Sequence, residues 1–65
     1  MILKQDGSYM TNKMFFDNKE WTLIGSKANG AVLSTLDSFK SDKGEYITLK
    51  RERVLNGFKL GKITI

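Results

Sequence analysis

The sequence predicts a mainly β domain, a β-rich α+β fold built on a small five-stranded antiparallel sheet or partly open barrel. We expect it to be OB- or SH3-like, with one short helix at about 31–40. Two observations predict this class. Dipeptides that favour tight hairpin turns recur at Asp6-Gly7, Asn29-Gly30 and Asn56-Gly57. Most segments between the turns are short and alternate apolar with polar residues. A chain of 65 residues is expected to form a single domain over 1–65.

The expected strands are residues 1–5, 8–16, 21–27, 45–55 and 58–65. Within 8–16, Met10, Met14 and Phe16 share one face and are candidates for the core. Two further clusters of turn-forming residues, at 17–20 and 41–44, separate neighbouring strands. The protein is therefore expected to consist mostly of antiparallel hairpins.

Residues 31–40 are the one stretch that does not alternate. Leu36 and Phe39 would point to opposite faces of a strand, whereas a helix would place all the apolar residues on one side: Val32, Leu33, Leu36 and Phe39. The Asn29-Gly30 dipeptide argues for a hairpin instead. If the helix does not form, six strands in a meander remain.

Composition excludes several functional classes. The chain has no histidine and no cysteine, so imidazole and thiolate chemistry, disulfides and the usual zinc sites are absent. The acidic residues fall in turns and form no calcium-loop pattern. We therefore expect a non-enzymatic protein without a cofactor or metal. The sequence has no run of about 18 apolar residues and no signal-peptide pattern, so we expect a cytoplasmic protein with no membrane contact.

Positive charge gathers at the end of the chain. Lys50 to Ile65 carries five basic side chains against Glu52 alone, which accounts for the whole net charge of +4. If Asn56-Gly57 forms a turn, these residues lie on one basic hairpin, where they would contact the phosphates of a nucleic acid while nearby aromatic rings stack on bases. The predicted nucleic-acid-binding residues are Lys50, Arg51, Arg53, Lys59, Lys62, Tyr46 and Phe58. The same charges would also suit a solvated edge hairpin without a ligand.

A second hypothesis is a protein–protein function. Small chains rich in lysine and asparagine are typical of phage or mobile-element proteins that inhibit or adapt a host protein by direct contact. Phe15, adjacent to Phe16 but on the opposite face of the strand, and the terminal residues Ile63 and Ile65 are the candidate interface. Because the core is small, we also expect a homodimer or a higher homo-oligomer.

Overall fold

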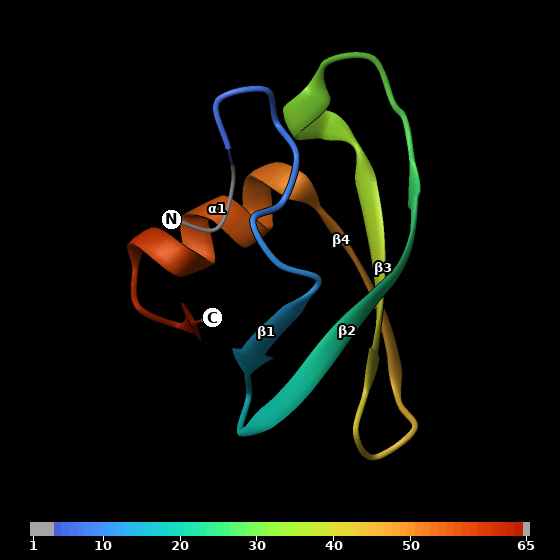
Figure 1. The fold of residues 1–65 in the computed structure, drawn as a ribbon, viewed down its shortest axis with the longest axis vertical. Helices are drawn as coiled ribbons and strands as arrows, with labels where there is room; N and C mark the ends of the chain where they lie inside the picture. The colour runs from blue at the N-terminus through green and yellow to red at the C-terminus, as the bar shows by residue number, and fades with distance from the viewer. Residues whose placement is uncertain (1–3, 65) are drawn as a thin grey trace.

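The computed structural model describes residues 4–64 and has the predicted fold class. Five antiparallel strands form a curled sheet resembling half a barrel, in the order β4-β3-β2-β1-β5, and one short helix packs on it (Figure 1). The elements are β1 (Lys13–Phe16), β2 (Lys19–Lys27), the 3-10 turn η1 (Val32–Ser34), β3 (Leu36–Ser41), β4 (Tyr46–Lys50), α1 (Arg51–Lys59) and β5 (Ile63–Thr64).

Three of the predicted turns are present. Phe16 pairs with Lys19, and the two residues between them, Asp17 and Asn18, have φ of 55° and 59°. Positive φ at both central positions is the geometry that joins two strands with the twist of a sheet. Gly44 (φ 84°) closes the β3–β4 turn, and Gly7 (φ 86°) lies in a turn before β1. The strand expected at 1–5 is wrong for Lys4 and Gln5, which belong to this turn or precede it; residues 1–3 lie outside the described part.

A β-bulge interrupts the pairing of β2 with β3. Leu23 lies opposite Phe39 and Gly25 opposite Ser38, so Ile24 is an extra residue. The bulge places Ile24 and Gly25 consecutively on the same side of the sheet and returns Ser26 to the side of Leu23. The orientation of Ser26 toward the interior is therefore a consequence of the bulge.

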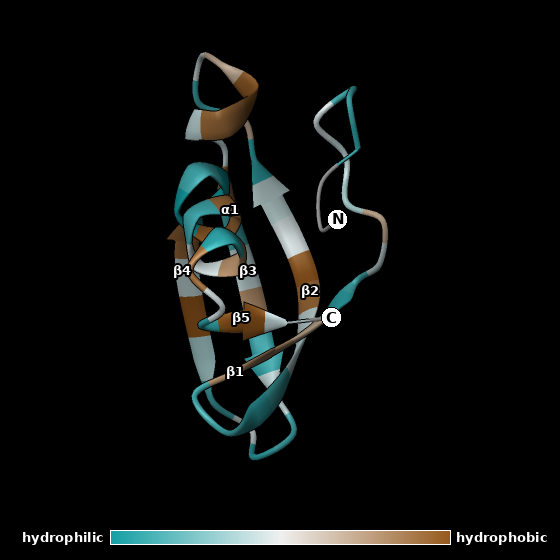
Figure 2. Cartoon of the chain, turned by 90° about the vertical axis from the view of Figure 1, so that its left-hand side faces the viewer, coloured by the Kyte–Doolittle hydropathy of each residue, from teal (hydrophilic) through white to brown (hydrophobic). Residues whose placement is uncertain are grey.

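The interior lies on one side of the sheet, beneath α1, β5 and the N-terminal segment (Figure 2). The buried apolar residues come from four strands and the helix: Met14, Trp21, Phe39, Val54 and Ile63. Phe16 packs against them as expected. Met10, expected on the same face, is instead 54% exposed because β1 begins only at Lys13.

The helix predicted at 31–40 is wrong. Residues 32–34 form only a 3-10 turn, and β3 begins at Leu36. The inward positions of β3 are occupied by Asp37, Phe39 and Ser41, all buried, while Leu36 points outward. Polar residues inside and an apolar residue outside remove the alternation by which a half-buried strand is recognised.

The hairpin predicted at Asn56-Gly57 is also wrong, because the single helix of the described residues lies there instead. Val54, Leu55 and Phe58 share one face of α1 and turn toward the core. The helix ends at Lys59, and Gly61 (φ 75°) turns the chain away from it: the N–H groups of Gly61 and Lys62 donate to the carbonyl oxygens of Phe58 and Gly57 at 3.1 and 2.8 Å. These two bonds form a Schellman C-cap.

Gly57 lies inside this helix because Ile63 packs against it. A Cβ at position 57 would lie 2.5 Å from Ile63 Cδ1 and 2.8 Å from Cγ1. Glycine therefore allows β5 to approach the helix closely. The glycine marks a tertiary contact, whereas in the sequence it resembles a turn signal.

Candidate nucleic-acid interface

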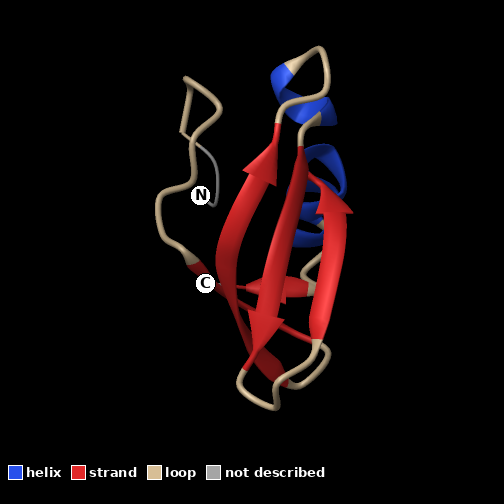
Figure 3. Ribbon diagram, turned by 90° about the vertical axis from the view of Figure 1, so that its right-hand side faces the viewer, coloured by secondary structure: helices blue, strands red, loops and turns tan. Residues whose placement is uncertain are grey.

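The side of the sheet opposite α1 is not covered by any element among residues 4–64 (Figure 3). Residues paired across neighbouring strands lie on the same side of the sheet, and side chains alternate along each strand. The pairs that lie between the core pairs therefore belong to the uncovered face. It carries two transverse rows of residues paired directly across neighbouring strands. The first row is Lys13, Thr22, Lys40 and Tyr46; the second is Lys27, Leu36 and Lys50.

A row of small residues lies between these two rows. Gly25 is paired with Ser38, and Ser38 with Thr48, whose side-chain oxygen lies 3.2 Å from that of Ser38. A Cβ at Gly25 would meet nothing within 4 Å, so space above the sheet is open at this point. Beside Gly25, Ile24 of the bulge is 53% exposed. The central row of the face thus has small, uncharged side chains, whereas the row on either side of it carries lysines.

The uncovered face has a strong excess of positive charge. It holds four lysines, Lys13, Lys27, Lys40 and Lys50, and one carboxylate, Glu20, on β2. Lys13 Nζ lies 3.7 Å from Glu20 Oε1, a contact between two exposed side chains. The ammonium of Lys40 lies 5.7 Å from the ring centroid of Tyr46, which is 65% exposed. This face therefore combines exposed cations with an accessible aromatic ring.

Behind the face, the covered side of the sheet holds a buried polar cluster. The carboxylate of Asp37 accepts hydrogen bonds from the hydroxyl groups of Ser26 and Tyr9 and from the guanidinium of Arg51. Arg51 also donates to the carbonyl oxygen of Gly7 at 2.6 Å, and its guanidinium stacks 4.9 Å from the ring centroid of Tyr9. The cluster joins the N-terminal segment, β2, β3 and α1 at one point.

The charges in this cluster stabilise one another. Burial alone would raise the pKa of Asp37, but the hydrogen bonds from Arg51, Ser26 and Tyr9 outweigh it and hold that pKa below its usual value. Burial and the hydrogen bond to Asp37 raise the pKa of Tyr9 well above 10.0. The hydrogen bond to Asp37 likewise raises the pKa of Arg51. No buried side-chain nitrogen or oxygen within residues 4–64 lacks a partner. The cluster therefore serves to hold the N-terminal segment, the sheet and the helix together.

The predicted nucleic-acid-binding residues do not lie on one surface of the structure. Tyr46 and Lys50 lie on the uncovered face, whereas Arg53 and Lys59 are exposed on α1, which covers the other side of the sheet. Lys62 is exposed beyond the helix. They therefore do not form one basic hairpin.

Two predicted residues are turned inward. Arg51 is held by Asp37, so its guanidinium is not available to a phosphate. Phe58 packs against the core, which leaves Tyr46 as the exposed ring of the predicted pair.

The three residues of the predicted protein interface also differ from one another. Phe15 is 49% exposed, as expected from its place opposite Phe16. Ile63 is wrong as an interface residue, since it is 3% exposed and packs beneath the helix. Ile65 lies outside the described residues. A host-protein partner remains a prediction.

Three lysines of the uncovered face, Lys13, Lys27 and Lys40, were not among the predicted site residues. Strand alternation could have found Lys13, which has the opposite parity to Met14 and Phe16 in the predicted strand 8–16. It would have placed Lys27 on the face of Trp21 and Leu23, because only the bulge at Ile24 turns Lys27 outward. Lys40 could not be placed in this way while residues 31–40 were assigned to a helix.

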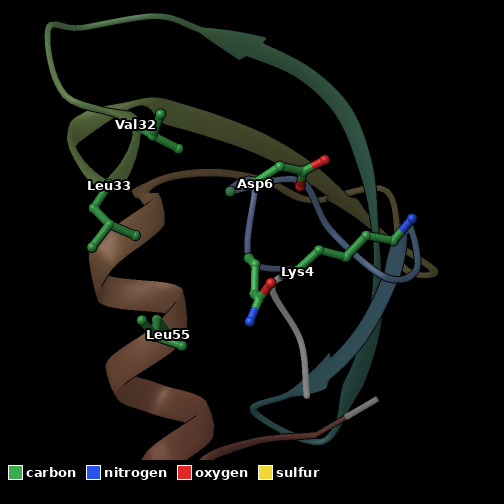
Figure 4. A pocket seen from close by; sticks show the side chains of 7 residues that line it. Lys4, Asp6, Val32, Leu33 and Leu55 are labelled. Carbon is green, nitrogen blue, oxygen red and sulfur yellow. The ribbon is translucent and has the colours of Figure 1, made fainter.

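A separate apolar cavity of about 330 Å³ opens between the N-terminal turn, η1 and α1 (Figure 4). Val32 and Leu33 from η1 and Leu55 from α1 form its apolar wall, and Lys4 and Asp6 lie opposite. It lies on the covered side of the sheet, away from the lysine rows.

No family model, curated protein or solved structure matches this chain. Across residues 4–64, no helix is both long and apolar enough to cross a membrane. The same residues contain no group of three or more acidic side chains placed to hold a metal ion. Because no comparison indicates a function, a functional proposal has to be based on the geometry of the uncovered face.

Proposed function

We propose that this protein binds single-stranded nucleic acid on the uncovered face of its sheet. The observation that carries the proposal is the arrangement of two lysine rows on either side of a low row of small residues, with an exposed tyrosine in one lysine row. Non-specific single-strand binding requires a positive surface that follows the backbone and rings on which bases stack. Both features are supplied by residues that are not needed to build the core.

Each part of the face has a distinct role in this proposal. The lysines neutralise phosphates and release counterions, which supplies most of the affinity. Tyr46 stacks on a base, an interaction worth about 1–3 kcal/mol. Gly25 lets the ligand approach the sheet closely, and the hydroxyl groups of Ser38 and Thr48 offer hydrogen bonds to sugars or bases. The rows cross β3 at Leu36 and Lys40, four residue steps apart, so their separation is about 13 Å at ~3.3 Å per step.

The choice of a single strand follows from the shape of the face. A shallow sheet surface with an exposed ring suits unpaired bases, whose faces are accessible. The exposed basic residues of α1, by contrast, are only Arg53 and Lys59, on a helix of nine residues. Lysine contacts to phosphates carry no base information, so we expect weak sequence preference and a strong dependence on salt.

The test is a fluorescence-anisotropy titration of labelled single-stranded DNA, single-stranded RNA and duplex DNA over a range of salt concentrations. The double variant Lys27→Gln/Lys50→Gln removes two charges from the uncovered face. The matched control Arg53→Gln/Lys59→Gln removes two charges from the helix. We expect the first variant to bind more weakly and to lower the slope of log K against log salt by about 1.4, because each phosphate contact contributes ~0.7 for a single strand.

The control variant should bind almost as tightly as the wild-type chain, with an unchanged slope. If both double variants lost the same affinity, general charge would be responsible and the assignment to the sheet face would be wrong. Tighter binding of the duplex than of either single strand would also contradict the proposal. Absence of binding at low salt would remove nucleic acid as the partner.

A further inference from the structure

Strand β4 forms an edge of the sheet, and no strand within residues 4–64 pairs with its outer side. Two backbone hydrogen bonds at the ends of the β3–β4 ladder show which backbone groups face outward. Ser41 N–H donates to the carbonyl of Glu45, and Arg51 N–H donates to that of Thr35. Both pairs continue the β3–β4 register, so the odd-numbered residues of β4 bond to β3. The backbone groups of Tyr46, Thr48 and Lys50 therefore point away from the sheet.

This edge lacks most of the features that prevent strands from associating. Its five residues are paired with β3 in one regular register, without a bulge and without proline. The outward side chains carry a charge only at Lys50, and the inward side chains Ile47 and Leu49 remain half-buried. Natural sheets usually blunt such an edge with proline, bulges, inward charges or a covering segment.

The sequence of β4 is complementary to itself when two copies run antiparallel. We propose that β4 pairs with β4 of a second copy of this chain around a two-fold axis at Thr48. Tyr46 then lies opposite the partner's Lys50, and Ile47 lies opposite the partner's Leu49. The first contact is a cation–π pair on the uncovered face, and the second buries two half-exposed apolar residues on the core side. Thr48 faces the partner's Thr48 in a hydrogen-bonded pair.

The dimer would extend the candidate site across the two-fold axis. The row that ends at Tyr46 continues into the partner's Lys50, so the partner copy supplies a basic residue beside the aromatic ring. Self-pairing itself needs no nucleic acid. Only its effect on binding, a longer basic surface with tighter binding of longer oligonucleotides, rests on the function proposed above.

The first experiment measures molecular mass without nucleic acid, by light scattering and analytical ultracentrifugation across a range of concentrations. We expect a mass that rises with concentration toward twice 7.4 kDa. Thr48→Pro removes the central N–H from both copies, and its dimer should dissociate about 30-fold more readily because two hydrogen bonds are lost. Thr48→Ala keeps the N–H and is the matched control, which should dimerise like the wild-type chain.

A charge exchange tests the register even if Thr48→Pro does not fold. Lys50→Glu removes the cation opposite Tyr46 and should weaken the dimer. Adding Tyr46→Lys to Lys50→Glu places opposite charges across the two-fold axis and should restore it. A monomer at every concentration, an assembly larger than a dimer, or a failure of the second substitution to restore pairing would overturn the proposal. Because mass is measured without ligand, these outcomes are independent of the anisotropy result.

Discussion

The guanidinium of Arg51 and the carboxylate of Asp37 form an ion pair in which Nη2 lies 3.0 Å from Oδ1 and Nε lies 3.1 Å from Oδ2. Asp37 is fully buried, and the Arg51 side chain is only 13% exposed. The pair connects the first residue of α1 to the inner face of β3. It thereby sets where the helix lies on the sheet and removes one cation from the surface.

Breaking this pair should strongly destabilise the fold. Asp37→Ala leaves the guanidinium of Arg51 buried without its counterion, a change that costs about 3–5 kcal/mol in other proteins. For a domain of this size, whose free energy of unfolding is ~3–10 kcal/mol, that loss approaches the whole stability. Urea or thermal denaturation followed by circular dichroism would measure it.

The matched control is Glu20→Ala, which removes an exposed ion pair with Lys13. That change should alter the free energy of unfolding by less than about 1 kcal/mol. Equal effects of the two substitutions would show that the buried pair does not hold the helix in place.

Alkaline pH should destabilise the protein through Tyr9. Folding raises the pKa of Tyr9 above 10.0, so the folded state holds its phenolic proton more tightly than the unfolded chain does. This contribution is complete below pH 10.0 and is lost as the pH rises through the folded-state pKa. The free energy of unfolding, measured by denaturation at a series of pH values, should therefore decrease less with rising pH for Tyr9→Phe than for the wild-type chain.

Tyr46→Phe is the control for this experiment, since Tyr46 is exposed and its hydroxyl takes part in no hydrogen bond among the described residues. It should keep the wild-type dependence on pH. If Tyr9→Phe also kept that dependence, the interaction between the Tyr9 hydroxyl and Asp37 would not contribute to alkaline stability.

Gly57→Ala should lower stability although alanine is the better helix former. The added methyl group would overlap Ile63, and overpacking costs about 1–3 kcal/mol, which exceeds the ~1 kcal/mol gained in helix propensity. Asn56→Ala, at the exposed neighbouring position, should instead be neutral or slightly stabilising. Thermal melts of both variants measure the difference.

Ile63→Val should partly rescue Gly57→Ala, because it removes the Cδ1 atom that lies nearest to the added methyl group. A stabilised Gly57→Ala variant would mean that the contact between β5 and the helix is loose.

Tyr46→Ala should weaken single-strand binding by roughly five- to 150-fold, the equivalent of one stacking interaction of about 1–3 kcal/mol. Tyr46→Phe keeps the ring and should bind nearly as well as the wild-type chain. Anisotropy titrations of these two variants would test the role of the ring. Measured in the Thr48→Pro background, whose dimer is expected to dissociate more readily, the same comparison also separates stacking from changes in assembly.

The sequence was sufficient to predict the fold class and the turns at 17–20 and 41–44, because Asp-Asn and Gly at these positions act through local backbone geometry. It was not sufficient at 31–40 or at 51–59, where contacts with residues far away in the sequence determine the secondary structure. Asp37 is tolerated inside β3 only because Arg51, Ser26 and Tyr9 surround it. Such partners cannot be identified from the local pattern of a single strand.

The same limit applies to the candidate site. Clustering of charge along the chain indicated a basic surface, and Tyr46 and Lys50 do lie on the uncovered face. The sheet, however, assembles its lysine rows from residues far apart in sequence, including Lys13 and Lys27. The predicted set failed where adjacent residues in sequence were assumed to be adjacent in space.

Lys50 and Arg51 are consecutive, yet one ends a strand on the uncovered face and the other begins a helix within the buried cluster. No loop separates them. The backbone of Lys50 is therefore held on one side by its pairing with β3 and on the other by the helix that Arg51 anchors on Asp37. A ligand on this face would meet a backbone whose position is already set, so the conformational entropy lost on binding would be mainly that of the exposed side chains.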